Sequence, residues 1–122
     1  MANMIPISTV TVGSGGASAI QFSGIPQIYN DLLIKLSTRT NLNGLADGLI
    51  LTINGSTAGI VTTKTIQGNG AAVSSFGPPS GSDVYAGDTD GSTATSNTFG
   101  STEIYIPNYT SANNKSFSND HV

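Results

Sequence analysis

The chain has 122 residues, of which 37% are hydrophobic and 9% are charged, and its formal net charge is −3. This length supports one domain with a modest core, and the absence of cysteine excludes disulfides, thiolate metal sites and a cysteine nucleophile. Four basic residues are too few for a phosphate-binding stripe, so we expect no nucleic-acid partner.

Residues 1–6 contain neither the basic segment nor the apolar segment of a signal peptide. No apolar run in the chain approaches the roughly 20 residues that cross a membrane. We therefore expect synthesis in the cytoplasm without a signal peptide, and no membrane partner.

The first part of the chain alternates short apolar runs with turn residues. Residues 5–12 and 17–23 are predicted strands, with a bulge near residues 8–9 that corrects the alternation of the first. The glycine cluster at residues 13–16 supplies the positive φ angles that a hairpin turn between them needs.

Residues 31–39 give the clearest strand prediction, because apolar side chains alternate with polar ones. The apolar positions are Leu32, Ile34 and Leu36. A second strand is predicted at residues 48–53, with Leu49, Leu51 and Ile53 on one side. The Asn54–Gly55 pair then predicts a hairpin turn, with residues 58–66 as the returning strand.

Residues 67–97 are dominated by Gly, Ser, Thr, Ala and Asp, and we predict a long surface excursion with one short strand around Val84. Residues 98–107 return to strand character, with Ile104 and Ile106 on one face. A last strand begins near residues 115–118. We expect either a longer natural chain or a neighbouring chain to supply the pairing that this strand lacks.

Many short strands and no helical periodicity predict an all-β fold, namely an antiparallel, jelly-roll-like β-sandwich with a long Gly/Ser/Thr-rich loop. Residues 1–122 would form a single domain that lacks its last strands.

The densest carboxylate cluster is Asp83, Asp88 and Asp90. The run from Asp88 to Gly91 is similar to the start of a calcium loop, but the acidic residue that such a loop needs downstream is missing. We prefer the interpretation that these residues form turns. His121 is the only histidine, and we expect a solvated residue in a mobile tail.

Three tyrosines, Tyr85, Tyr105 and Tyr109, together with Phe99, are candidates for a carbohydrate-binding surface, because aromatic faces stack on sugars. The simpler interpretation is that they pack with one polar end in water. Asp31 and Glu103 could be an acid/base pair only at a suitable separation, which sequence does not give. We therefore expect no enzyme activity, no catalytic residue and no cofactor.

Much of the chain resembles a family of small, largely uncharacterised virion proteins of marine and cyanobacterial tailed phages. The resemblance rests on strand and turn segments at residues 7–17 (ISTVTVGSGGA), 20–26 (IQFSGIP), 29–32 (YNDL), 36–39 (LSTR), 53–56 (INGS), 97–109 (NTFGSTEIYIPNY) and 114–118 (NKSFS). Members generally run further and end with more strands. The resemblance implies a virion structural component and no catalytic residues.

We therefore expect a non-enzymatic component of the virion exterior, with capsid decoration or cement as the preferred role. The expected partners are copies of the chain itself, for which capsid geometry suggests a trimer, and other virion proteins such as the major capsid protein or tail proteins. The alternative is a tail-fibre or tail-tip adhesin that binds host-surface glycans through residues 67–97 and the tyrosines. A carbohydrate-active enzyme is a third interpretation, with no motif behind it.

Overall fold

The structure is a computed structural model, and it describes residues 4–55, 63–68, 70–77 and 84–122. These residues form strands, turns and extended segments. No helix occurs among them, and so none that is long and apolar enough to cross a membrane. All pairings between the named strands are antiparallel, which confirms the predicted all-β class.

The first sheet has three strands in the order β1-β6-β7. Its members are β1 (Leu32–Thr38), β6 (Gly100–Ile106) and β7 (Ser118–His121). Ile34 of β1 lies opposite Ile104 of β6, so the apolar alternations of the two strands face the same way. The predicted strands at residues 31–39 and 98–107 are thereby confirmed. The last strand, predicted to begin near residues 115–118, is confirmed as β7.

The second sheet pairs β2 (Ala46–Leu51) with β5 (Val84–Asp90). Its register shifts between Gly48, which faces Asp88, and Ile50, which faces Tyr85. One residue of β2 therefore faces two residues of β5, which is a β-bulge. Gly87 lies in the bulge with a φ of 118°, a conformation that a residue with a side chain rarely adopts.

A separate hairpin is formed by β3 (Thr65–Gly68) and β4 (Val73–Phe76). Most of its side chains are exposed. The Phe76 ring meets the edge of Tyr85 at a centroid distance of 5.6 Å, and this contact joins the hairpin to the second sheet.

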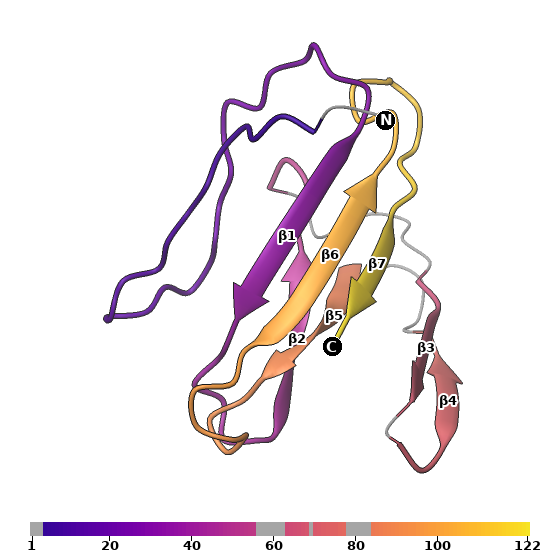
Figure 1. Ribbon diagram of the computed structural model, residues 1–122. Helices are drawn as coiled ribbons and strands as arrows, with labels where there is room; N and C mark the ends of the chain where they lie inside the picture. The colour runs from indigo at the N-terminus through magenta and orange to yellow at the C-terminus, as the bar shows by residue number, and fades with distance from the viewer. Residues whose placement is uncertain (1–3, 56–62, 69, 78–83) are drawn as a thin grey trace.

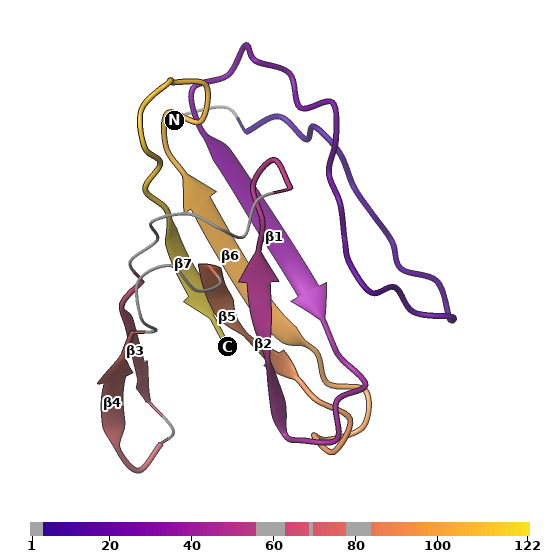
Figure 2. The same cartoon turned by 180° about the vertical axis from the view of Figure 1, so that it is seen from behind.

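The two sheets lie in two layers, with β1, β6 and β7 in one and β2 and β5 in the other (Figures 1 and 2). Across the layers β5 packs against β6 and β7, and the core lies between them. The buried apolar side chains of the described chain all belong to β5 and β6: Val84, Ala86, Ile104 and Ile106. The described sheets are small and do not close, so a jelly-roll-like sandwich stays a prediction.

Among the described residues, the core is less completely covered between β1 and β2 than between β5 and β6. Strands β1 and β2 are not among the element pairs in close contact across the layers. Their core-facing side chains pack against the buried cluster but are only half-buried; they are Leu32, Ile34, Leu36, Leu49 and Leu51. We call this set the open edge, because further apolar material placed beside it would complete the core.

Residues 4–30, which we call the arm, form no strand, so the strand predictions for residues 5–12 and 17–23 were wrong. The glycine turn between them is present, with the Gly16 N–H donating to the Gly13 carbonyl at 3.0 Å. The arm runs out and back as an open loop on the β1 side of the molecule, away from the sheets (Figures 1 and 2). A strand pattern forms a strand only where a partner backbone is available, and the arm has none within the described chain.

Residues 67–97 contain more regular structure than a surface excursion. The predicted short strand around Val84 is confirmed, but it is seven residues long and supplies part of the core. The predicted turn is confirmed at Asn54 and Gly55, whose φ angles are 54° and 73°. Most of the predicted returning strand at residues 58–66 lies outside the described residues, and Thr65 and Ile66 pair with β4 instead.

Candidate functional site

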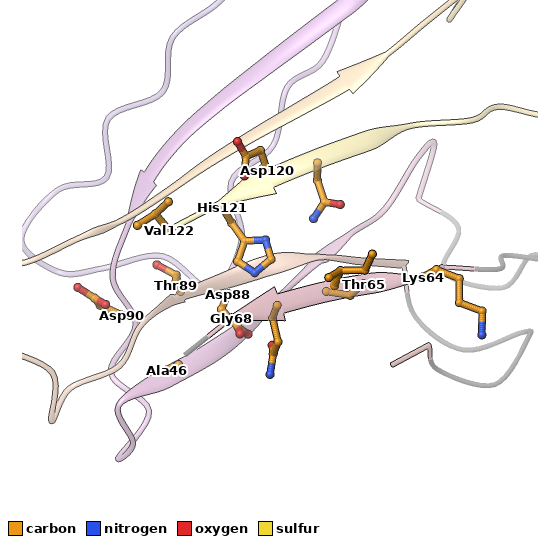
Figure 3. Close-up of a pocket in the computed structure, with 13 residues that line it drawn as sticks. Ala46, Lys64, Thr65, Gly68, Asp88, Thr89, Asp90, Asp120, His121 and Val122 are labelled. Atoms are coloured by element: carbon orange, nitrogen blue, oxygen red, sulfur yellow. The ribbon is translucent and has the colours of Figure 1, made fainter. Parts of the chain in front are cut away.

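An open groove of about 550 Å³ lies between the β3–β4 hairpin and strands β5 and β7 (Figure 3). Its lining includes the polar side chains of Gln67, Asp88, Asn119 and His121 beside apolar surface. The His121 ring projects from β7 toward β5, whereas the carboxylate of Asp120 points to the opposite side of β7. The lining therefore combines polar groups with apolar surface in about equal measure, and the His121 ring stands at its wall.

The prediction that His121 is a solvated tail residue was wrong. His121 is the last residue of β7, lies opposite Thr102 and is half-buried. Its ring meets Tyr85 edge-on at a centroid distance of 6.2 Å. Gly87 makes room for it, since a Cβ at that position would lie 2.9 Å from the Cγ atom of His121.

Tyr85 lies beside the groove and close to Asp88, which lines it. Burial raises the pKa of Tyr85 far above its usual value, and the hydrogen bond to Asp88 and the negative charge of Asp88 raise it further. The phenol therefore stays protonated. A protonated phenol of this kind positions a neighbour and does not serve as a base.

The structure does not place the described candidate metal ligands, Asp88 and Asp90, in a cation-binding loop. Asp83 lies outside the described residues, and Asp88 and Asp90 belong to the extended strand β5, separated by the buried Thr89. An extended strand does not wrap a cation as a calcium loop does. In the described part of the chain, no three His, Asp or Glu side chains are grouped so that they could hold a metal ion.

The candidate tyrosines do not form one surface. Tyr105 is 40% exposed on the outer face of the first sheet. Tyr109 packs against the core cluster, and its hydroxyl donates to the Pro26 carbonyl. Tyr85 lies beside the groove, and Phe99 is exposed in the segment between β5 and β6.

Asp31 links the end of the arm to the end of β6. Its carboxylate accepts hydrogen bonds from the Asn108 N–H at 2.9 Å and the Tyr105 hydroxyl at 2.8 Å. The hydrogen bond from the Asn108 N–H lowers the pKa of Asp31 below its ordinary 3.8, and the hydrogen bond from Tyr105 lowers it further. The bond between Tyr105 and Asp31 also raises the pKa of Tyr105. Glu103 pairs instead with Lys35 at 2.8 Å, so Asp31 and Glu103 have separate structural partners.

The contribution of Asp31 to stability should therefore depend on pH. A carboxyl with a lowered folded-state pKa stabilises the fold fully above its unfolded pKa, and loses that effect as pH falls through the folded value. We expect Asp31→Asn to be less stable than the parent chain at pH 7 and equal to it in strong acid. Urea unfolding across this pH range measures the difference. Asp120→Asn, an exposed carboxylate on β7, is the control, and an Asp31→Asn difference independent of pH would contradict this assignment.

Arg39 organises the segment between β5 and β6, a role that the sequence does not signal. Its guanidinium donates to four backbone carbonyls: Ser92 at 3.2 Å, Ala94 at 3.0 Å, Thr95 at 2.7 Å and Thr98 at 3.0 Å. The planar guanidinium holds its N–H donors in fixed directions and can therefore bind several carbonyls at once, whereas an ammonium group offers fewer fixed donors.

We expect Arg39→Lys to lower the free energy of unfolding by about 1 to 2 kcal/mol, because charge-assisted hydrogen bonds are lost. Faster hydrogen exchange at the amides of residues 92–98 would locate the effect. Lys35→Ala is the matched control, because its ion pair with Glu103 is exposed and contributes about 0 to 1 kcal/mol. Equal effects of the two substitutions would contradict the role given to Arg39.

The arm exposes several apolar side chains and carries no charge. Residues 4–30 contain no charged side chain. Seven of their large apolar side chains are 36% to 78% exposed: Met4, Ile5, Ile7, Val10, Val12, Ile20 and Ile28. Monomeric proteins rarely expose apolar surface in continuous stretches, and such stretches mark sites of contact with other proteins.

Comparison of the chain with protein-family models, with curated proteins and with solved structures finds no match.

Proposed function

We propose that this chain is a non-enzymatic structural component of the exterior of a tailed-phage virion, with capsid decoration as its role. The observation that carries the proposal is the balance of apolar side chains. Among the described residues, four apolar side chains are buried, whereas seventeen large ones are exposed. A chain with this balance is suited to assembly, because its apolar surface can be removed from water only by neighbours.

The proposed virion role rests on the resemblance of the strand and turn segments described above to those of phage virion proteins. In this proposal the two sheets are parts of a jelly-roll-like sandwich that is completed within the assembly. The partners are further copies of the chain and the proteins of the shell. Contacts of this kind act mechanically and need no reactive side chain.

Counting the copies in purified particles tests the proposal. Quantitative mass spectrometry of the particle, scaled to its major capsid protein, should find the chain in hundreds of copies. A particle that lacks the chain would contradict a virion role. A handful of copies would contradict capsid decoration and place the chain in the tail.

A second candidate is a tail adhesin that binds host-surface glycans, and the groove is the observation that favours it. Gln67, Asp88 and Asn119 offer hydrogen-bonding groups for sugar hydroxyls, and His121 offers a ring. This function predicts binding to a glycan array that is lost in Asp88→Asn and kept in Asp47→Asn, a carboxylate of β2 outside the groove lining. No binding above background would contradict it.

A further inference from the structure

The open edge and the arm are complementary features of the same chain. The open edge consists of half-buried apolar side chains at one side of the core. The arm is an uncharged segment with exposed apolar side chains and without a strand partner in the described chain. Each copy therefore offers one apolar donor segment and one incomplete core edge.

The backbone at this side is also available for pairing. Among the described residues, β1 pairs with β6 alone in the first sheet and β2 pairs with β5 alone in the second. An unpaired strand edge is a template for another strand, and soluble proteins usually protect it with charges or proline. Residues 5–12 of the arm are a candidate for such an added strand, since they carry a β-strand pattern and no charge; Pro6, which has no backbone N–H to donate, stands near their start.

The root of the arm is fixed so that the arm leads away from its own sheets. The Tyr109 N–H donates to the Asn30 carbonyl at 3.1 Å, and the Tyr109 hydroxyl donates to the Pro26 carbonyl. Asp31 is held by Asn108 and Tyr105 immediately beyond. From this clamped root the arm extends on the β1 side without contacting the open edge as a strand (Figures 1 and 2).

We propose that the arm of one copy packs on the open edge of a second copy, with residues 5–12 added as a strand beside β1 or β2. The occupant is a second copy because the described part of each chain presents both the donor segment and the acceptor edge, and the apolar side chains that would meet are uncharged. Reciprocal exchange closes a dimer, and exchange in one direction closes a ring such as a trimer. This inference rests on the assembly role proposed above, and it names the contact that would build the assembly.

Size-exclusion chromatography with light scattering tests the proposal on the full chain. The parent chain should have the mass of a closed oligomer that dissociates on dilution. Val10→Asp, in the arm, should weaken the association about 30-fold or more, because it places a charge in an apolar interface. The control is Ile66→Asp, which introduces the same charge on β3, where the parent side chain is 77% exposed. It should leave the association unchanged.

Circular dichroism of each variant separates dissociation from unfolding, since the arm lies outside the core and its variant should keep the parent β spectrum. A parent chain that is monomeric at every concentration would overturn the proposal. So would a Val10→Asp chain that keeps the mass of the parent oligomer.

Cross-linking distinguishes a second copy from closure of the arm on its own chain. The protein contains no cysteine, so Val10→Cys and Ser37→Cys chains can be mixed and treated with a short bis-maleimide. A mixed dimer, formed in higher yield than either chain forms with itself, supports exchange between copies. A chain that carries both Val10→Cys and Ser37→Cys is the second test. Efficient cross-linking within single copies of this double variant, with no dimer, would overturn exchange between copies.

The two proposals can fail separately. Arm exchange is measured on the purified chain, and the virion role is measured on the particle. A monomeric chain found in hundreds of copies on the particle would overturn arm exchange alone. An oligomer that depends on the arm but is missing from the particle would overturn the virion role alone.

Discussion

Ile104→Ala is expected to destabilise the chain by about 2 to 5 kcal/mol, the range found when a large aliphatic side chain is removed from a packed core. Ile104 is 1% exposed at the centre of β6 and lies opposite Ile34. Few other buried apolar side chains share the core with it. Domains of this size are stable by only about 5 to 15 kcal/mol, so this one substitution should remove a large part of the total.

Urea denaturation followed by circular dichroism measures the loss. Ile66→Ala is the matched control, because the same side chain is removed from an exposed position of β3, and its effect should stay within about 0.5 kcal/mol. Equal losses for the two variants would mean that the core does not lie between β5 and β6.

Gly91→Ala is expected to destabilise the chain by about 3 kcal/mol, the upper part of the range for overpacking. Gly91 follows β5 where two loops meet, and its N–H donates to the Leu45 carbonyl at 2.9 Å. A Cβ at this position would overlap the carbonyl oxygen of Gly44 and lie 2.8 Å from the carbonyl carbon. Because backbone atoms cannot rotate away, the two loops would have to separate.

Gly15→Ala is the control for Gly91→Ala. A Cβ at Gly15 meets nothing within 4 Å, and the residue has no positive φ angle, so the effect should be neutral or slightly stabilising. The midpoints of thermal unfolding of the two variants give the comparison. A Gly91→Ala chain as stable as the Gly15→Ala chain would contradict the close packing of the two loops.

The strands that combine strict alternation with large apolar residues could be predicted from the sequence. Leu32, Ile34 and Leu36 in β1 and Ile104 and Ile106 in β6 mark their core faces plainly, and all of them contact the core cluster. The pattern succeeds here because burial on one face of a strand repeats every second residue.

The length and burial of β5 could not be predicted, because small and polar residues occupy its buried positions. Gly87 and Thr89 are buried beside Ala86, and such residues in sequence indicate a turn. The Thr89 hydroxyl is satisfied by donating to the Thr38 carbonyl at 2.6 Å, a partner 51 positions earlier in the chain. Such a long-range partner is invisible to local patterns.

The groove and the arm show two further limits of sequence reasoning. His121 reaches the groove wall because Gly87 leaves space for its ring, a pairing that depends on the fold. In the arm the pattern was strong and the strand was absent, because pairing needs a second backbone. The arm is an apolar alternation without a strand partner in the described chain, and this is the observation behind the proposed pairing between copies.

Hydrogen exchange of the arm, followed by mass spectrometry over a range of protein concentrations, tests the central claim most directly. If arms of other copies complete the core, amides of residues 5–12 should become strongly protected as concentration rises, together with those of β1 or β2. The hairpin β3–β4 should show no such dependence. Arm amides that exchange at the rate of a free peptide at every concentration would contradict the claim.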